Sequence, residues 1–277
     1  MRGQITRQIS NLYTVTTEEK AYECNARGRF RNDHISPLVG DYVEFDPENQ
    51  YILEILPRKN ELKRPSICNI DQAVIVTSYK HPDFQPNLLD KMIVILEYNN
   101  IHPIICFTKL DLASKNELSE FKKLKAYYQG IGYTVLKNTE LTKLKSIFKN
   151  KLTVFTGQTG VGKSTLLNKL DKELNLKTNE ISEALGRGKH TTRHVELYPL
   201  YHGLVADTPG FSALDFHEMT SHDIRDNFIE FHQYGQDCKY RDCMHLKEDH
   251  CKVKDLVASG KILQTRYENY QKFLTER

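Results

Sequence analysis

The first part of the chain alternates short apolar stretches with turn-forming residues. Stretches with strand character occupy residues 4–15, 20–24, 28–31, 41–46 and 51–56, and Gly28, Pro37, Gly40, Pro47 and Pro57 punctuate them. Short strands at a spacing of about 8–12 residues, separated by turn signals, are typical of small all-β folds. The pattern therefore predicts that residues 1–66 form a five-stranded β-barrel of the oligonucleotide-binding (OB) type.

Beyond the barrel the pattern changes to alternating buried strands and helices. Residues 73–78 (AVIVTS) and 101–107 (IHPIICF) are almost continuously apolar, as expected for strands that are covered on both faces. Further strands are predicted over 133–136, 152–156, 195–199 and 204–206, and helices over 88–98, 117–128 and 164–170. Alternating strands and helices favour an α/β domain with a mainly parallel sheet, which we place at residues 67–218.

The last part of the chain, residues 219–277, has helical character on both sides of a cysteine-rich segment. Helices are expected over 221–234 and over most of 253–275, and three of the six cysteines lie with a histidine between residues 238 and 251. The other cysteines, Cys24, Cys68 and Cys106, are far apart, which favours a metal cluster and reduced thiols over a disulfide framework. We expect a helical metal-binding module and a cytoplasmic location.

Composition and charge remove some classes of function. The 277 residues include 39 Lys and Arg against 36 Asp and Glu, a net charge of +3, which by itself gives no argument for nucleic acid or membrane binding. No apolar run approaches the roughly 18 residues of a membrane-spanning helix, and the N-terminus lacks the apolar core of a secretory signal. We expect a monomer without a membrane partner.

A phosphate-binding loop is the strongest motif in the sequence. It comprises Gly157, Gln158, Thr159, Gly160, Val161, Gly162, Lys163 and Ser164, followed by Thr165. The loop follows a predicted buried strand and opens a predicted helix, which is the context that distinguishes it from an ordinary glycine-rich turn. Backbone N–H groups would surround a phosphate, Lys163 would reach the β- and γ-phosphates, and the Ser164 hydroxyl would bind Mg²⁺.

Two further motifs point to a guanine nucleotide. The DTPG segment begins at Asp207, which can hold Mg²⁺ through water, and ends at Gly210, whose N–H can sense the γ-phosphate. The TKLD segment comprises Thr108, Lys109, Leu110 and Asp111, and follows the strand 101–107. The Asp111 carboxylate can accept two N–H groups of guanine, which adenine does not supply. Thr108 replaces the usual Asn of this motif, and a hydroxyl supplies fewer hydrogen bonds than an amide.

The order of these motifs along the chain is circularly permuted. TKLD precedes the phosphate loop, which precedes DTPG, whereas in Ras-type GTPases the phosphate loop comes first. Together with a barrel before and a Cys/His segment after it, the chain resembles the ribosome small-subunit-dependent GTPase A family over essentially its whole length. The segments Arg64-Pro65, 69–73 (NIDQA) and 186–192 (GRGKHTT) also carry the resemblance.

The resemblance implies a function and several further residues. It implies GTP hydrolysis to GDP stimulated by the small ribosomal subunit, rRNA binding, and a role in late assembly of that subunit. It also implies that 186–192 contain the first switch segment, where Thr191 or Thr192, with a slight preference for Thr192, binds Mg²⁺. Phe211 stands where many GTPases carry a water-orienting Gln, so His190 is the candidate for that role. The second guanine element is hard to place, and Asn138-Thr139 is a weak candidate.

The cysteine-rich segment predicts a structural zinc site. Cys238, Cys243, His245 and Cys251 supply three thiolates and one imidazole within 14 residues. Such a set closes a tetrahedral Zn²⁺ shell and leaves no open position for catalysis. Free thiols beside an unrelated histidine are the simpler alternative, and His250 is a rival ligand. The family resemblance favours His245.

An arginine stripe in the barrel is a candidate RNA contact. Arg27, Arg29 and Arg31 alternate with a period of two, so on a strand all three would point to one face and Phe30 to the other. That face could meet RNA phosphates, or it could be a solvated edge protected by charge.

Two other functions fit parts of the sequence. One is an RNA-binding module that holds GTP as a ligand with negligible turnover. The other is an ATP-dependent enzyme, against which Asp111 argues because adenine lacks the two N–H groups.

Overall fold

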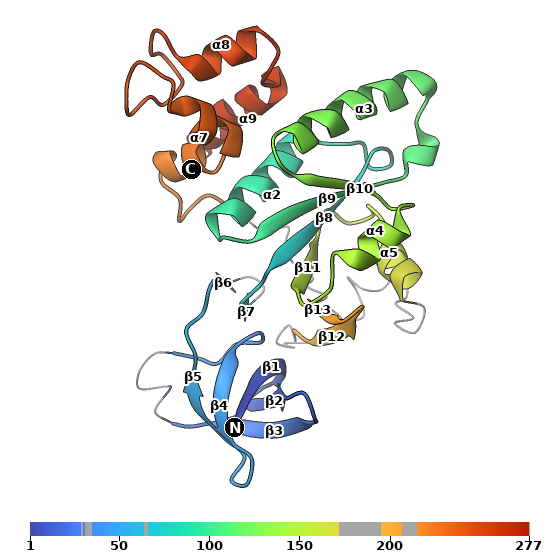
Figure 1. Ribbon diagram of the computed structural model, residues 1–277, viewed down its shortest axis with the longest axis vertical. Coiled ribbons are helices and arrows are strands. Elements are labelled where there is room, and N and C mark those ends of the chain that lie inside the picture. Colours follow the sequence, from blue (N-terminus) through green and yellow to red (C-terminus); the bar gives the residue numbers. More distant parts are fainter. Residues whose placement is uncertain (29, 31–34, 64–65, 172–194, 207–214, 277) are drawn as a thin grey trace. The chain divides into compact units, whose positions relative to one another are not determined.

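The computed structural model describes residues 1–276 except 29, 31–34, 64–65, 172–194 and 207–214 (Figure 1). The chain forms two compact units, and each is described by itself. The first comprises Met1–Val74 with Asn138–Ser212, and the second comprises Ile75–Lys137 with Ala213–Arg277. The division into three domains at 66/67 and 218/219 stays a prediction.

The N-terminal part of the first unit is a closed five-stranded barrel, drawn in blue in Figure 1. Its strands are β1 (Arg2–Ile9), β2 (Leu12–Thr16), β3 (Ala21–Ala26), β4 (Tyr42–Asp46) and β5 (Tyr51–Ile55), closed in the order β1-β2-β3-β5-β4. Ile5, Val15, Val43, Phe45 and Ile52 alternate inward and are fully buried. The closed five-stranded barrel confirms the predicted fold of this part.

Two predicted strands of the barrel are wrong in detail. Residues 4–15 form a hairpin of β1 and β2 and not one strand, because the chain turns at Ser10, whose φ is 53°. Residues 28–31 were expected to form a strand, but β3 ends at Ala26, Gly28 lies in a turn, and Phe30 is helical. The Phe30 N–H bonds the Arg27 carbonyl at 3.2 Å, a local turn that ends the alternation.

The rest of the first unit carries the strand before the phosphate loop. β11 (Leu152–Thr156) pairs in parallel with β13 (Gly203–Ala206), which pairs antiparallel with β12 (Leu197–Leu200). The hairpin of β6 (Glu61–Lys63) and β7 (Ser66–Cys68) and the helices α4 (Leu141–Ser146) and α5 (Lys163–Leu170) complete this part. All five residues of β11 are buried, as its apolar run predicted. β13 begins at a glycine because a Cβ on Gly203 would lie 1.9 Å from the Phe148 carbonyl oxygen.

The second unit begins within β8 (Gln72–Ser78) and contains the other predicted α/β elements. β10 (Thr134–Lys137) pairs in parallel with β9 (His102–Thr108), in the order β10-β9-β8. α2 (Pro86–Tyr98) starts with proline in its first turn, and α3 (Lys115–Gly130) starts with a capping box of Ser114 and Glu117. Proline and reciprocal capping satisfy the geometry of helix starts, so both helices begin two residues ahead of the apolar spacing that predicted them.

The C-terminal part of the second unit consists of four short helices. They are α6 (Ser221–Asp226), α7 (Ile229–Gly235), α8 (Lys252–Ala258) and α9 (Gln264–Thr275). The single helix expected over 221–234 breaks at Phe228, which has an extended backbone (φ −85°, ψ 92°) and a fully buried ring. Burying this ring in the core overrides the local helical tendency of the segment.

The four helices share a core with α2. Val94 and Ile95 of α2 pack in one cluster with Phe216, Phe228 and Phe273, among others. The fully buried Arg266 of α9 bonds Asp90 of α2 at 2.7 Å and Glu230 of α7 at 2.8 and 2.9 Å. Charges removed from water are tolerated only when they are paired and hydrogen-bonded, so this network fixes α9 and α7 to α2. Among the described residues, no helix is long and apolar enough to cross a membrane.

Candidate nucleotide site and metal centre

The phosphate loop follows directly from β11 in the first unit. Gly157, Gly160 and Gly162 have φ values of 140°, 81° and 94°, a region that residues with a side chain rarely adopt. Val161 is buried and anchors the loop, whereas Thr159 and Gly160 are exposed. The three glycines therefore allow a loop conformation in which backbone N–H groups face outward around an anion.

The helix after the loop completes an anion-binding geometry. α5 begins at Lys163, its N-cap is Gly162, and no side chain caps or acidifies its first turn. The Lys163 ammonium lies over the loop and donates to the carbonyl oxygens of Gly157 at 2.6 Å and Gln158 at 2.9 Å. Ser164 is half-buried and Thr165 exposed. A positive helix end and a fixed ammonium favour a bound phosphate.

The TKLD segment lies at the carboxyl end of β9 in the second unit. Thr108 is 2% exposed, and its hydroxyl donates to the Thr77 carbonyl of β8 at 3.4 Å. Lys109 has a left-handed backbone (φ 55°), and its ammonium donates to the His81 carbonyl. Leu110 starts a short 3-10 helix that carries Asp111, which is exposed. The Thr108 hydroxyl thus bonds the neighbouring strand β8. The Asp111 carboxylate is exposed and can accept hydrogen bonds from N–H donors.

Several predicted site residues lie outside the described residues. They are Asp207 to Gly210 and Phe211, His190, Thr191 and Thr192 with the rest of 186–192, Arg29 and Arg31, and Arg64-Pro65. The strand expected before Asp207 is present as β13, which ends at Ala206. Arg27 is described and exposed, but the turn at Gly28 removes the strand on which the arginine stripe was based. Asn138 is half-buried and Thr139 exposed, directly after β10.

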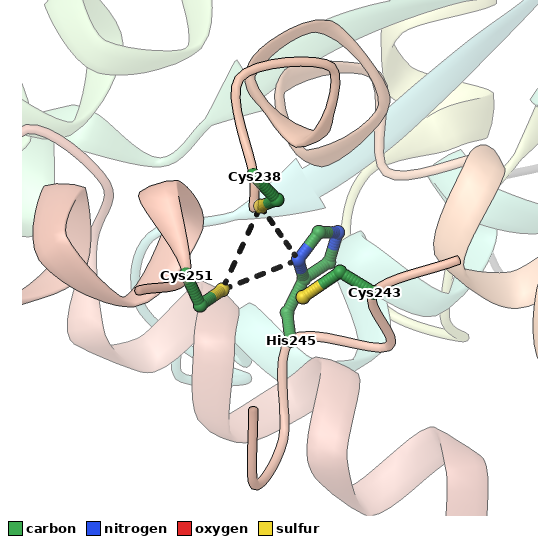
Figure 2. Close-up of side chains that lie close together, drawn as sticks. All are labelled: Cys238, Cys243, His245 and Cys251. Carbon is green, nitrogen blue, oxygen red and sulfur yellow. Dashed lines mark hydrogen bonds between the residues drawn. The ribbon is translucent and has the colours of Figure 1, made fainter. Parts of the chain in front are cut away.

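The four predicted zinc ligands converge in the C-terminal part of the second unit (Figure 2). One ligand atom from each of Cys238, Cys243, His245 and Cys251 lies within 4.8 Å of all the others. The His245 Nδ1 atom is 3.4 Å from the Cys251 sulfur and 3.7 Å from the Cys238 sulfur. His250 is exposed and stands apart from this set. The geometry favours Nδ1 of His245 as the imidazole ligand.

Residues around the cluster hold the ligand loop in place. The Glu248 carboxylate accepts the N–H groups of Met244 at 2.7 Å and Leu246 at 2.8 Å, one on each side of His245. The Tyr267 hydroxyl of α9 donates to the His245 carbonyl at 2.6 Å. A Cβ on Gly235, at the end of α7, would lie 3.2 Å from two atoms of the imidazole ring. These three residues were not predicted, because nothing in their own sequence pattern marks them as neighbours of His245.

Burial sets the protonation of the cluster. It lowers the pKa of His245 to about 4 and raises the pKa of Cys251 to about 12. The pKa of the Cys243 thiol is also raised, chiefly by burial. The imidazole is therefore neutral near pH 7 and ready to ligate, whereas buried thiolates need a cation. Three thiolates and one imidazole are a donor set that fits Zn²⁺ and compensates the burial.

Known proteins resemble this chain over its whole length. The family model described as RsgA GTPase matches residues 55–217, and the model described as RsgA N-terminal domain matches residues 2–52. A small ribosomal subunit biogenesis GTPase RsgA from Enterococcus faecalis is 51% identical and covers 100% of this chain and 95% of the relative. One from Bacillus velezensis is 50% identical, covering 99% and 96%.

Two solved structures share the fold. The crystal structure of YloQ, a circularly permuted GTPase, is 40% identical with a TM-score of 0.85 and covers 99% of this chain and 94% of its own. The structure of YjeQ from Thermotoga maritima is 32% identical with a TM-score of 0.85, covering 99% and 97%. Because the chain shares its fold over nearly its whole length with a circularly permuted GTPase, the order of its motifs is that of a circularly permuted GTPase fold.

Proposed function

The chain belongs to the RsgA GTPase family, and on that premise we propose that it binds the small ribosomal subunit and hydrolyses GTP to time its own release during late assembly. The full-length similarity to relatives named small ribosomal subunit biogenesis GTPases carries this proposal. GTP hydrolysis itself follows from the family. We propose in addition that its partners are the small subunit and the rRNA of that subunit, and that it works as a monomer.

We propose that the phosphate loop and TKLD bind one GTP. Lys163 and the N–H groups of 157–165 hold the β- and γ-phosphates, which the positive end of α5 favours. Asp111 accepts the N1–H and N2–H of guanine, so a base without them would leave the carboxylate without partners. Thr108, Lys109 and Leu110 position Asp111 through the contacts of the β9 end.

The remaining catalytic roles rest on the family resemblance. Mg²⁺ would neutralise phosphate charge, held by the hydroxyls of Ser164 and Thr192 and, through water, by Asp207. Gly210 would donate its N–H to the γ-phosphate. Phe211 cannot orient water, so His190 is proposed to hold the attacking water molecule.

The barrel and the C-terminal helical module are proposed to bind the small subunit, and we call them the outer modules. Residues 1–66 form the barrel, and Arg27, which directly follows β3, is with Arg29 and Arg31 a candidate contact to rRNA phosphates. Residues 219–277 are stiffened by the proposed zinc site of Cys238, Cys243, His245 and Cys251, with no part in catalysis. Residues 67–218 form the GTPase domain between them.

Phosphate release tests the proposal. It is measured in steady state with the chain alone, with small subunits, with large subunits and with whole ribosomes, using GTP and then ATP. We expect phosphate release from GTP and not from ATP, and we expect small subunits to stimulate it strongly. Negligible turnover in every mixture, despite GTP binding, would instead support an RNA-binding module that holds GTP as a ligand.

A further inference from the structure

The segment 69–73 (NIDQA) joins the barrel to the strand of the phosphate loop. It carries the family resemblance, yet none of the roles proposed above uses it. All the contacts described below lie in the first unit, which contains the barrel, β11 and the phosphate loop. Asn69 and Gln72 are 6% and 5% exposed, so both side chains must find hydrogen-bond partners inside the protein.

Asn69 ties the segment to Gly40 before β4, and Asn60, in the link between β5 and β6, holds Ile70. The Asn69 amide donates to the Gly40 carbonyl at 3.0 Å and accepts the Lys59 N–H at 2.9 Å. The Asn60 amide bonds both backbone groups of Ile70, at 2.7 and 2.8 Å. Gly40 is itself held by β1, because its N–H donates to the Ile5 carbonyl at 2.8 Å. The barrel side of the junction therefore has fixed geometry.

Asp71 ties the same segment to β11. Its N–H donates to the Leu152 carbonyl at 2.9 Å, and its Oδ2 accepts the Leu152 N–H at 2.6 Å. Both backbone groups of the first residue of β11 are thus bonded by one residue. The other carboxylate oxygen, Oδ1, accepts the Lys59 ammonium at 2.5 Å. The carboxylate therefore connects Lys59, which precedes Asn60, with Leu152 at the start of β11.

Gln72 makes the next contact in the same direction. Its amide donates to the hydroxyl of Thr153 at 2.9 Å and to the Ile147 carbonyl at 2.8 Å. Thr153 is the second residue of β11 and is fully buried. Consecutive residues of the junction therefore hold consecutive residues of the strand, which leaves little freedom for β11 to slide or rotate against the barrel.

A second contact links the barrel to the strand pair beside β11. Arg7 of β1 forms an isolated antiparallel bridge with Glu196, and their side chains approach to 3.7 Å. Glu196 directly precedes β12, the hairpin partner of β13. β11 ends at Thr156 and the phosphate loop starts at Gly157, so a displacement of the buried strand reaches the loop without an intervening flexible segment.

We propose that Asp71 is a positioning residue that couples the barrel to the phosphate loop. When the barrel engages its partner, the Asp71 carboxylate transmits the barrel's position to Leu152 and through β11 to Gly157–Lys163. The inference rests on the proposed function, because it assigns to Asp71 a share in stimulation by the small subunit. A displacement near 1 Å in a reacting site costs up to about a hundredfold in rate, so a short rigid link suffices.

The test compares variants that differ in length and charge at this position. Asp71→Glu keeps the charge but moves the carboxylate by one methylene; Asp71→Asn keeps the length and one acceptor for Leu152. Lys59→Ala removes only the ion pair, and Asp46→Ala removes a barrel carboxylate that accepts hydrogen bonds from Glu48 and Asn49. Stimulated and unstimulated turnover, KM for GTP and small-subunit affinity are measured for each.

We expect Asp71→Glu to lower the stimulated kcat at least about tenfold, with KM, unstimulated turnover and subunit affinity within about twofold of the parent chain. Asp71→Asn, Lys59→Ala and Asp46→Ala should stay within about threefold of the parent chain in stimulated kcat. A normal stimulated rate in Asp71→Glu overturns the proposal, as does a loss that follows subunit affinity or melting temperature in parallel.

A second measurement does not depend on the ribosome. In the GDP complex of the full chain, amide hydrogen exchange of residues 152–164 should be at least about tenfold faster in Asp71→Glu, with β1 to β3 unchanged. Unchanged exchange in this segment overturns the positioning role. If the parent chain shows no stimulation by small subunits, the proposed function fails by itself, and exchange alone decides the role of Asp71.

Discussion

Single side chains in this protein are placed by contacts that the surrounding backbone dictates. Lys163 lies over its own loop because the carbonyls of Gly157 and Gln158 point at its ammonium. Asp111 is exposed because Lys109 takes a left-handed backbone and starts a short helix that turns the carboxylate outward. Both proposed nucleotide-binding residues are therefore positioned by local geometry, and their substitutions should act on function more than on folding.

Asp111 should determine the choice of base. In Asp111→Asn the side-chain NH₂ can pair with a 2-oxo group, so we expect preference to move from GTP toward XTP by at least about tenfold. Competition binding with both nucleotides measures the shift. The matched control is Asp83→Asn, an exposed loop carboxylate of the same unit. Unchanged GTP preference in Asp111→Asn would remove TKLD from the guanine site.

Lys163 should be needed for turnover but not for folding. Lys163→Ala removes the ammonium that reaches the β- and γ-phosphates, and we expect stimulated hydrolysis to fall at least about a hundredfold. Lys169→Ala changes an exposed lysine of the same helix and should leave hydrolysis unchanged. Phosphate release is measured together with zinc content and the far-UV spectrum. Near-normal hydrolysis in a folded Lys163→Ala protein would contradict the assigned role.

At the scale of elements, the sequence pattern predicts strands better than it predicts helix ends and turns. β11 matches its predicted range of 152–156, because a short apolar run before a glycine loop has few alternatives. The strand over 28–31 was wrong because alternating Arg and Phe mimic a strand, whereas the chain turns at Gly28. The pairing of Asp90 with Arg266 joins residues 176 positions apart, and no local pattern reports such a contact.

Spacing predicted the Cys/His cluster, because its four residues fall within 14 residues, and the family resemblance favoured His245 as its imidazole. Their spacing did not decide between His245 and His250, since both neighbour a cysteine ligand. Burial and geometry favour His245, which is 2% exposed with Nδ1 toward two sulfurs, whereas His250 is exposed. Of the supporting residues, Gly235 ends α7, Glu248 lies in the loop before α8 and Tyr267 lies in α9, so their contacts with His245 became visible only in the packed structure.

Removing the cation of the buried ion network should strongly destabilise the second unit. Arg266→Ala leaves Asp90 and Glu230 buried without their partner, and we expect a loss of about 3–5 kcal/mol in the free energy of unfolding. Lys272→Ala, in the same helix, removes an exposed pair with Glu276 and should cost less than about 1 kcal/mol. Urea unfolding followed by far-UV circular dichroism compares the two. Equal costs would show that the network contributes no more than a surface pair.

Zinc content should depend on His245, and the stability of the metal-free protein should fall at low pH. The purified chain should contain about one zinc, which His245→Asn should lose and His250→Asn should keep.

The stability of the metal-free protein should depend on pH through His245. In this form the folded pKa of His245, about 4, lies below its ordinary 6.5. Protonation then favours the unfolded form, so the contribution of His245 is present above pH 6.5 and is lost as the pH falls toward 4. Metal analysis and unfolding at several pH values measure both; zinc retained by His245→Asn would exclude this ligand.

At the scale of the whole molecule, each unit combines a nucleotide motif with an outer module. The first unit contains the barrel and the phosphate loop, and the second contains TKLD and the Cys/His cluster. Within the first, Asp71 bonds Lys59 and Leu152, the first residue of β11. Within the second, Arg266 joins the C-terminal helices to α2. In the first unit, the barrel, for which we propose rRNA contact, is thus connected by a short, bonded path to the strand that precedes the phosphate loop.

This arrangement predicts that attachment to the small subunit depends on the nucleotide. Two modest contacts combine into one tight attachment only when geometry lets both form at once, and we propose that GTP is the ligand that favours this geometry. We expect affinity for small subunits to be at least about tenfold higher with a non-hydrolysable GTP analogue than with GDP, a coupling of the usual size. Co-sedimentation at several salt concentrations measures it, since contacts to rRNA phosphates weaken with salt. The Lys163→Ala chain is the control, because loss of phosphate contacts should bring its affinities with the two nucleotides together. Equal affinity of the unsubstituted chain with GDP and with the analogue would leave hydrolysis without a means of timing release.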